Sequence, residues 1–144
     1  MPQPIQNKHS RPIVLVVDDN PADVNLIHEA FDEEHIECGF WVEKDGAGAI
    51  EQIEQLDADD SRPCPDIVLL DLNLPKVSGE EVLKRARSSR RCHDVKILIV
   101  SSSNSPSDRE RVMRFGATDY FRKPSTLQQF MELGPKVRGL LQSE

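Results

Sequence analysis

Polar residues stand at or just past the carboxyl ends of four apolar runs in this 144-residue sequence, where their side chains could do chemistry. Carboxylates follow the first and third runs, a hydroxyl follows the fourth, and an ammonium group lies just beyond the fifth: Asp18 and Asp19, Asp71, Ser101, and Lys123. In an open parallel sheet, ligands bind beyond the carboxyl ends of the strands, near the point where the strand order reverses. The sequence therefore predicts that these five side chains meet at one edge of a sheet.

Three carboxylates at one edge imply a bound cation. Asp18, Asp19 and Asp71 would repel one another at low dielectric, and a divalent cation among them would offset that repulsion. Clustered oxygen ligands favour Mg²⁺, which binds few carboxylates directly and keeps several waters. We therefore predict a Mg²⁺ site, with Mn²⁺ as a substitute ion.

A carboxylate beside such a cation, with a hydroxyl and an ammonium group nearby, can accept a phosphoryl group. Asp71 is the predicted nucleophile, because carboxylates form acyl phosphates. Lys123 and the metal would neutralise charge on the phosphoryl oxygens, and the Ser101 hydroxyl would donate to one of them. The predicted chemistry is Mg²⁺-dependent transfer of a phosphoryl group to Asp71.

The elements that must position these residues follow from the alternation of apolar runs with helical patterns. A capping side chain followed by proline marks two helix starts, at Asn20-Pro21 and Ser105-Pro106. Strands are expected at 13–17, 38–43, 66–71, 95–100 and 118–121, and each is followed by a helical pattern. This alternation predicts an α/β fold, a doubly wound parallel sheet of five strands with five helices. Gly134-Pro135 should kink or end the last helix early.

Length and composition predict a single soluble domain. We expect residues 1–11 to form a flexible polar tail and residues 12–144 to form the domain. The longest apolar runs span about five residues, far short of the roughly 20 that cross a bilayer, and the N-terminus lacks the apolar core of a secretory signal. A cytoplasmic location with no membrane partner follows. The net charge of −7 argues against direct binding of nucleic acid.

The cysteines and one basic segment carry no predicted chemistry. Cys38, Cys64 and Cys92 are odd in number and form no Cys-x-x-Cys pair, so neither a disulfide framework nor a zinc site is expected. The basic segment at 84–91 is interpreted as a solvated helix end that the helix dipole favours. Anion binding by that segment is the alternative interpretation.

Four segments in register make the sequence resemble the receiver domains of two-component response regulators. These segments are VVDDN, IVLLDLNLPKVSG, ILIVSS and DYFRKP, and the similarity extends over roughly Ile13 to Leu141. The resemblance implies a flavodoxin-like sheet with strand order 2-1-3-4-5, as in the chemotaxis member of the family. The segment DLNLPKVSG is also similar to that of small single-domain regulators that are paired with bacterial phytochromes.

The resemblance implies a role for each residue at the metal and phosphoryl site. Asp71 corresponds to the phosphoacceptor, Asp19 to a direct Mg²⁺ ligand and Asp18 to a largely water-mediated one. The backbone carbonyl of Asn73 would complete the protein ligands. The side chains of Asn73 and Ser103 correspond to positions that tune hydrolysis of the acyl phosphate.

The resemblance also implies how phosphorylation reaches the surface. Ser101 corresponds to the hydroxyl residue of the family, Lys123 to its lysine, and Tyr120 to the aromatic switch that turns inward when the hydroxyl moves. The implied partners are a sensor histidine kinase, with a phytochrome as a candidate, and a downstream protein or a second copy of the chain. The predicted function is a signalling switch that catalyses its own phosphotransfer and slow dephosphorylation, and it is not a turnover enzyme.

Two other functions fit part of the pattern. A haloacid-dehalogenase-type phosphatase also uses a strand-end aspartate with Mg²⁺, but it needs an acid two residues later, where this sequence has Asn73. A binding module could keep the fold without the chemistry, although all five functional side chains are present. No Gly-x-Gly-x-x-Gly follows a strand, which argues against dinucleotide binding.

Overall fold

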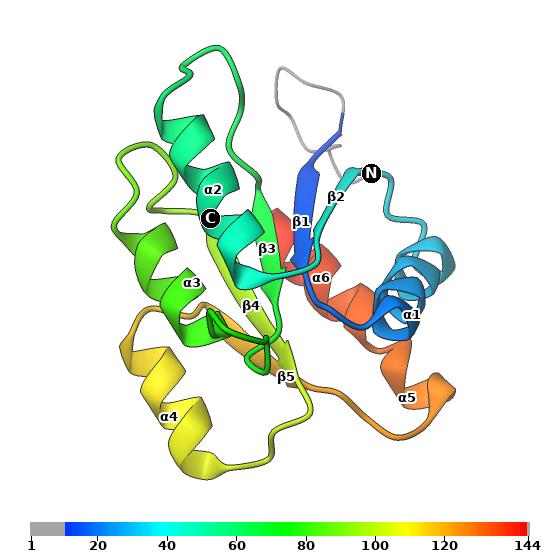
Figure 1. The fold of residues 1–144 in the computed structure, drawn as a ribbon. Coiled ribbons are helices and arrows are strands. Elements are labelled where there is room, and N and C mark those ends of the chain that lie inside the picture. Colours follow the sequence, from blue (N-terminus) through cyan, green and yellow to red (C-terminus); the bar gives the residue numbers. More distant parts are fainter. Residues whose placement is uncertain (1–10, 144) are drawn as a thin grey trace.

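A five-stranded parallel sheet forms the centre of the structure, a computed structural model that describes residues 11–143 (Figure 1). The strands are β1 Ile13–Val17, β2 Gly39–Glu43, β3 Ile67–Leu70, β4 Lys96–Ser101 and β5 Asp119–Arg122. Their order in the sheet is β2-β1-β3-β4-β5, which confirms the predicted α/β fold and its strand order. Apart from Arg11, the predicted tail at residues 1–11 lies outside the described residues.

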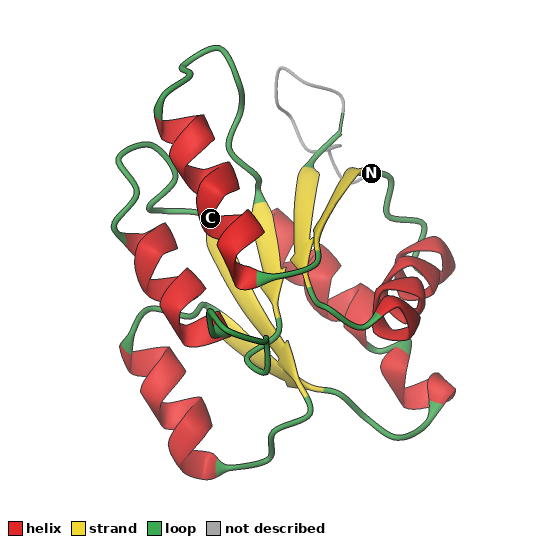
Figure 2. Ribbon diagram, viewed as in Figure 1, coloured by secondary structure: helices red, strands yellow, loops and turns green. Residues whose placement is uncertain are grey.

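Helices cover both faces of this sheet (Figure 2). They are α1 Pro21–Glu33, α2 Gly46–Asp57, α3 Gly79–Arg87, α4 Pro106–Arg114, α5 Leu127–Phe130 and α6 Leu133–Gln142. Helices α2, α3 and α4 pack on one face, and α1, α5 and α6 pack on the other. Within residues 11–143 we find no helix with the length and apolarity that crossing a bilayer requires.

The central strands are apolar on both faces because each face has its own core. In β3, Val68 and Leu70 point into the cluster with α2, α3 and α4, whereas Ile67 and Leu69 point into the cluster with α1, α5 and α6. This alternation follows from the two-residue period of a strand, and burial on both faces is typical of parallel sheets. Burial on both faces holds the carboxyl ends of the strands in place, and this sets the positions of the residues that follow them.

The predicted helix starts are confirmed. The Asn20 side chain accepts hydrogen bonds from the backbone N–H groups of Ala22 and Asp23, at 2.9 and 3.3 Å, and Pro21 is the first residue of α1. Ser105 caps α4 in the same way, again with a proline next in the chain. The α1 cap holds the chain directly after the Asp18-Asp19 pair, so the first turn of α1 lies beside these carboxylates.

The last helical segment is interrupted, as Gly134-Pro135 predicts. The break falls at residues 131–132, between α5 and α6, and it places Pro135 in the first turn of α6. A proline in a first turn removes no intrahelical hydrogen bond, because the first N–H groups of a helix have no partner within it. The helix therefore restarts before the proline.

The prediction that no disulfide forms is wrong, since Cys64 and Cys92 are bonded in the structure. Strands β3 and β4 are neighbours, with Ile67 paired to Lys96, so the loops that lead into these strands also lie next to each other. Cys64 precedes β3 and Cys92 precedes β4, and this brings the two sulfurs together although 28 positions separate them. Cys38 remains a free, half-buried thiol.

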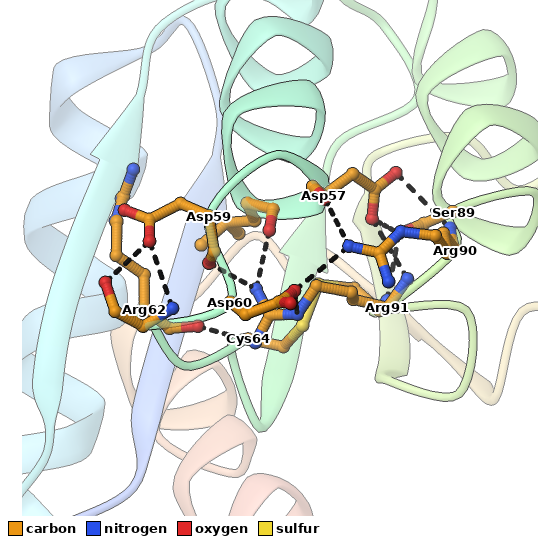
Figure 3. A network of polar contacts seen from close by, with 11 residues as sticks. Asp57, Asp59, Asp60, Arg62, Cys64, Ser89, Arg90 and Arg91 are labelled. Atoms are coloured by element: carbon orange, nitrogen blue, oxygen red, sulfur yellow. Dashed lines mark hydrogen bonds and ion pairs between the residues drawn. A yellow bond between two sulfur atoms is a disulfide. The ribbon is translucent and has the colours of Figure 1, made fainter.

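Only part of the basic segment at 84–91 is a solvated helix end. Lys84 is exposed, but the Arg87 guanidinium donates to the carbonyl oxygens of His93, Val95 and Gly116. The Arg91 guanidinium reaches the end of α2 and the loop after it, where it donates to the carbonyls of Leu56, Asp59 and Arg62, beside the disulfide (Figure 3). Arg87 and Arg91 therefore connect loops within the fold. Their N–H groups are bound to backbone carbonyl oxygens and are not available to bind an anion.

Candidate functional site

The carboxyl ends of the strands bring the predicted polar residues to one edge of the sheet. Strands β1 and β3 lie side by side at the point where the strand order reverses, and the backbone N–H of Asp71 donates to the carbonyl of Val17 at 3.0 Å. Ser101 ends β4, and Lys123 follows β5 with its N–H bonded to the Ser101 carbonyl at 2.8 Å. The edge where ligands bind in this kind of sheet therefore carries all five predicted side chains.

Three of these side chains form a cluster of carboxylates. Asp18, Asp19 and Asp71 each offer an oxygen, and these three oxygens lie within 4.8 Å of one another. Asp18 and Asp71 are 2% and 6% exposed, while Asp19 is exposed. The site is therefore open on the Asp19 side and buried at its base.

Backbone N–H groups orient the two buried carboxylates. Asp18 accepts from the N–H of Asn20 at 2.9 Å, and Asp71 accepts from the N–H of Asn73 at 3.1 Å. Burial raises the pKa of Asp18, and the charge of Asp71 raises it further, against the hydrogen bonds from Asn20 and Lys123. The fold thus concentrates negative charge where it is costly, which favours a cation.

Lys123 supplies one positive charge at the centre of the site. Its Nζ lies 3.0 Å from Asp18 Oδ2, 3.1 Å from Asp71 Oδ2 and 2.7 Å from Asp23 Oδ2. Burial alone would lower the pKa of Lys123, but hydrogen bonds to Asp23 and Asp18 and the charge of Asp71 raise it above the ordinary lysine value. The ammonium group therefore stays protonated at neutral pH.

Asp23 is the residue at this site that the sequence prediction missed. It lies in the first turn of α1, where an acidic residue is ordinarily explained by the helix dipole. The sequence offers no signal that separates it from an ordinary first-turn acidic residue, because Asp19 precedes the helix and helical spacing does not relate the two.

The hydroxyl side of the site is linked to the loop that follows β4. Ser101 is fully buried, and its Oγ accepts from the N–H of Ser103 at 3.3 Å and from the Asn73 side-chain amide at 3.5 Å. The Tyr120 hydroxyl donates to the Ser103 carbonyl at 3.0 Å, and the ring is 5% exposed. Ser103 also donates through its own hydroxyl to Asp108, in α4, at 2.8 Å. The loop after β4 thus joins Ser101, Tyr120 and the first turns of α4.

A cavity of about 800 Å³ opens above these residues. Its lining includes Asp19, Asp23, Asp71, Asn73 and Lys123, and it continues past the loop after β5 to α5. Gly79, at the start of α3, lies directly against the backbone of Asp71, where an added Cβ would be 2.2 Å from the Asp71 carbonyl oxygen. A small reactant can therefore reach the Asp71 carboxylate from solvent.

Comparison with known proteins identifies the family. The response regulator receiver domain matches residues 14–133. The probable methanogenesis regulatory protein FilR2 of Methanothrix harundinacea is 34% identical over 131 residues, which are 88% of this chain and 81% of FilR2. The transcriptional regulatory protein TrcR of Mycobacterium tuberculosis is 39% identical over 132 residues, but the chain spans only 44% of TrcR.

Solved structures agree with this family. The phosphorylated cyanobacterial phytochrome response regulator RcpA has a TM-score of 0.81 and 27% identity, covering 92% of this chain and 95% of RcpA. Response regulator RPA3017 in red light signalling of R. palustris has a TM-score of 0.75 and 26% identity, over 88% of this chain and 90% of RPA3017. The chain belongs to the response regulator receiver domain family, whose members act as phosphoacceptors in two-component signalling.

Proposed function

We propose that Asp71 is the residue that accepts the phosphoryl group in this receiver domain. The observation that carries the proposal is a buried carboxylate and a protonated lysine that line one open cavity, with the buried Ser101 hydroxyl linked to them through Asn73. Asp71 accepts a hydrogen bond from Asn73 through Oδ1 and contacts Lys123 through Oδ2, so its carboxylate is oriented before any reactant arrives. Such orientation lowers the barrier of a transfer step.

The residues around Asp71 would stabilise the transferred group. Lys123 would donate to one phosphoryl oxygen, and Ser101 to another, as negative charge builds up on them. Asn73 and Ser103 are exposed or half-buried beside the cavity and are our candidates for tuning hydrolysis. Because Ser101 and Tyr120 both bind the Ser103 segment, a shift of the Ser101 hydroxyl would move the loop before α4.

The acidic cluster fits a divalent cation. Its ligand oxygens are close together, two of the carboxylates are buried, and oxygen donors are what Mg²⁺ and Mn²⁺ prefer. Asp18, Asp19, Asp71 and the backbone carbonyl of Asn73 are the proposed ligands. A bound Mg²⁺ would supply positive charge to the phosphoryl oxygens.

We infer that the protein is a switch and not a general phosphatase. A phosphatase of the haloacid dehalogenase type requires an acid two residues after the nucleophile, and Asn73 cannot supply a proton from its amide. One phosphoryl group per protein, held on Asp71, is the expected product.

We propose that the protein acts in the cytoplasm and that a sensor histidine kinase is its phosphoryl donor. A phytochrome is a candidate for its sensor, since RcpA is a phytochrome response regulator and RPA3017 acts in red light signalling. The output would be a protein partner or a second copy of the chain.

Labelling of the purified protein with acetyl phosphate tests the proposed function. Intact-mass measurement should show one added phosphoryl group in the presence of Mg²⁺ and none with a chelator. Asp71→Asn should abolish the addition, whereas Asp94→Asn, whose side chain is 92% exposed, should label like the wild type. Equal labelling of Asp71→Asn and wild type would refute the proposal.

A further inference from the structure

Asp23 makes the shortest contact to the lysine of the site. Its Oδ2 lies 2.7 Å from Lys123 Nζ, compared with 3.0 Å for Asp18 and 3.1 Å for Asp71. Asp23 is 21% exposed at its side chain and does not belong to the cluster of three carboxylates that fits a cation. It therefore has no part in the chemistry proposed above, although it binds a residue that does.

The ammonium group of Lys123 has no donor to spare. A lysine ammonium carries three N–H groups, and three carboxylates lie at hydrogen-bond distance from this one. A hydrogen bond from Lys123 to a phosphoryl oxygen must therefore replace one of these contacts. Asp18 and Asp71 are at the centre of the site, whereas Asp23 pulls the ammonium toward α1.

Phosphoryl transfer makes the charge of Asp23 more costly. In this step an Asp71 oxygen forms a bond to phosphorus, and the donor leaves with the electron pair of the bond that breaks. The carboxylate, with one negative charge, becomes an acyl phosphate with about two. A carboxylate that shares the same ammonium group opposes this increase in negative charge.

We propose that Asp23 is a positioning residue that holds Lys123 on the α1 side of the site and thereby slows phosphorylation of Asp71. The inference rests on the proposed function of Asp71. Asp23 can hold Lys123 in place because its own backbone is held, with the Asp23 N–H donating to the Asn20 side chain at 3.3 Å. Asp23→Asn keeps the size of the side chain and that backbone contact, removes the charge, and replaces one acceptor oxygen by an amide N–H group.

The rate of labelling by acetyl phosphate at saturating Mg²⁺ is the first measurement. Asp23→Asn should label about two- to five-fold faster than wild type, a factor that matches the strength of a partly exposed ion pair. Asp23→Glu, which keeps the charge, should stay nearer the wild-type rate. Glu29→Gln is the charge-matched control, because Glu29 is exposed on the same helix, and it should not change the rate.

The second measurement needs no metal and no phosphoryl donor. In chelator, the side-chain ammonium of Lys123 should give a slowly exchanging signal in ¹⁵N NMR, which Lys123→Arg removes and so assigns. Asp23→Asn should speed the exchange of this signal with water, and Glu29→Gln should leave it unchanged. An unchanged exchange rate in Asp23→Asn would show that Asp23 does not hold the lysine.

The outcomes separate this inference from the proposed function. If Asp23→Asn labels at or below the wild-type rate while Asp71→Asn stays unlabelled, the role of Asp23 is wrong and that of Asp71 stands. If Asp71→Asn labels, the proposed function fails whatever Asp23→Asn does. Circular dichroism of each variant checks that the comparison is made on folded protein.

Discussion

At the scale of single residues, Asp19 differs from the other acidic groups at the sheet edge. Among the described residues, the carboxylates that contact Lys123 are Asp18, Asp23 and Asp71. Asp19 belongs to the carboxylate cluster but is not among the residues that form an ion pair with Lys123. Its negative charge therefore adds repulsion that the nearest positive group does not directly offset.

Asp19→Ala should weaken the metal site and stabilise the metal-free fold. The affinity for Mg²⁺, measured by calorimetry, should fall at least about ten-fold, because the direct ligand that we propose Asp19 to be is worth more than one exposed charge pair. In chelator, the free energy of unfolding should rise by about 0.5 to 1 kcal/mol as repulsion is relieved. Asp94→Ala is the control and should change neither quantity. A lower stability of Asp19→Ala in chelator would contradict the argument.

The residues that end strands could be predicted, and those that enter the site from a helix could not. Asp18, Asp71 and Lys123 stand out because a polar group interrupts or follows an apolar run. Asp23 is one acidic residue among others in a helix, and a sequence does not say which of them faces a lysine one hundred residues away. The pair forms only because the folded chain brings the first turn of α1 to the loop after β5.

At the scale of elements, the contact between α1 and α6 depends on a residue with no side chain. Gly134 lies against the end of α1, where an added Cβ would meet the Ala30 carbonyl oxygen and the Glu34 Cβ, both at 2.8 Å. The same helix contains Gly139, and an added Cβ there would meet nothing within 4 Å. A side chain at Gly134 would therefore clash with α1, whereas a side chain at Gly139 would be accommodated without contact.

Gly134→Ala and Gly139→Ala should change stability in opposite directions. Gly134→Ala should lower the free energy of unfolding by about 1 to 3 kcal/mol, because the two helices must move apart. Gly139→Ala should raise it by up to about 1 kcal/mol, since alanine has the better helix propensity. Urea unfolding of both variants checks the pair, and a loss of equal size in both would disprove the close-contact argument.

Asp57 ties the end of α2 to the loop before β4, and this contact depends on pH. A hydrogen bond from the Ser89 hydroxyl, at 2.6 Å, and others from the backbone N–H groups of Arg91 and Arg90 lower the pKa of Asp57 to about 2. The pKa is lower in the folded than in the unfolded protein, so the ionised group stabilises the fold. That contribution is complete above about pH 4 and is lost as the pH falls from about 4 to about 2.

Asp57→Asn should therefore remove stability at pH 7 and reduce its decline in acid. We expect a loss of about 1 to 2 kcal/mol at pH 7, less than the full pKa shift implies because the side chain is 16% exposed. Denaturant unfolding between pH 7 and pH 2 should show a shallower fall for the variant than for the wild type. Asp60→Asn, 81% exposed at its side chain, is the control and should keep the wild-type profile.

At the scale of the whole molecule, the disulfide is a long-range link that the sequence alone did not predict. The order and pairing of strands follow from the apolar pattern and the family resemblance, and they are confirmed. The link between Cys64 and Cys92 needs the register of β3 on β4, in which Ile67 meets Lys96, in addition to the strand order. Cys64 lies three residues before Ile67, and Cys92 lies four residues before Lys96. The two sulfurs meet only because these strand residues are paired, and the spacing of cysteines along the chain does not show that pairing.

Reduction of this disulfide should destabilise the protein without unfolding it. A loop of this length contributes roughly 3 to 4 kcal/mol through the entropy of the unfolded chain, or roughly 10 °C in melting temperature. The Arg91 contacts and the hydrogen bonds that Asp57 accepts should keep both loops in place after reduction. Scanning calorimetry with and without reductant measures the difference.

The cysteine variants identify the source of that effect. Cys64→Ser together with Cys92→Ser should melt like the reduced wild type and should not respond to reductant. Cys38→Ser should keep the full response, since Cys38 is the free thiol. A wild type whose melting temperature ignores reductant would contradict the prediction.

The same link also decides how the chain responds to a pulling force. If the molecule is stretched from its two ends, the 28-position segment between the sulfurs stays out of the load path while they are bonded. About 95 Å of contour length would then be missing from the unfolded trace and would return on reduction. Asp71 lies inside this shielded segment, so pulling under oxidising conditions does not extend the polypeptide around the proposed phosphoacceptor.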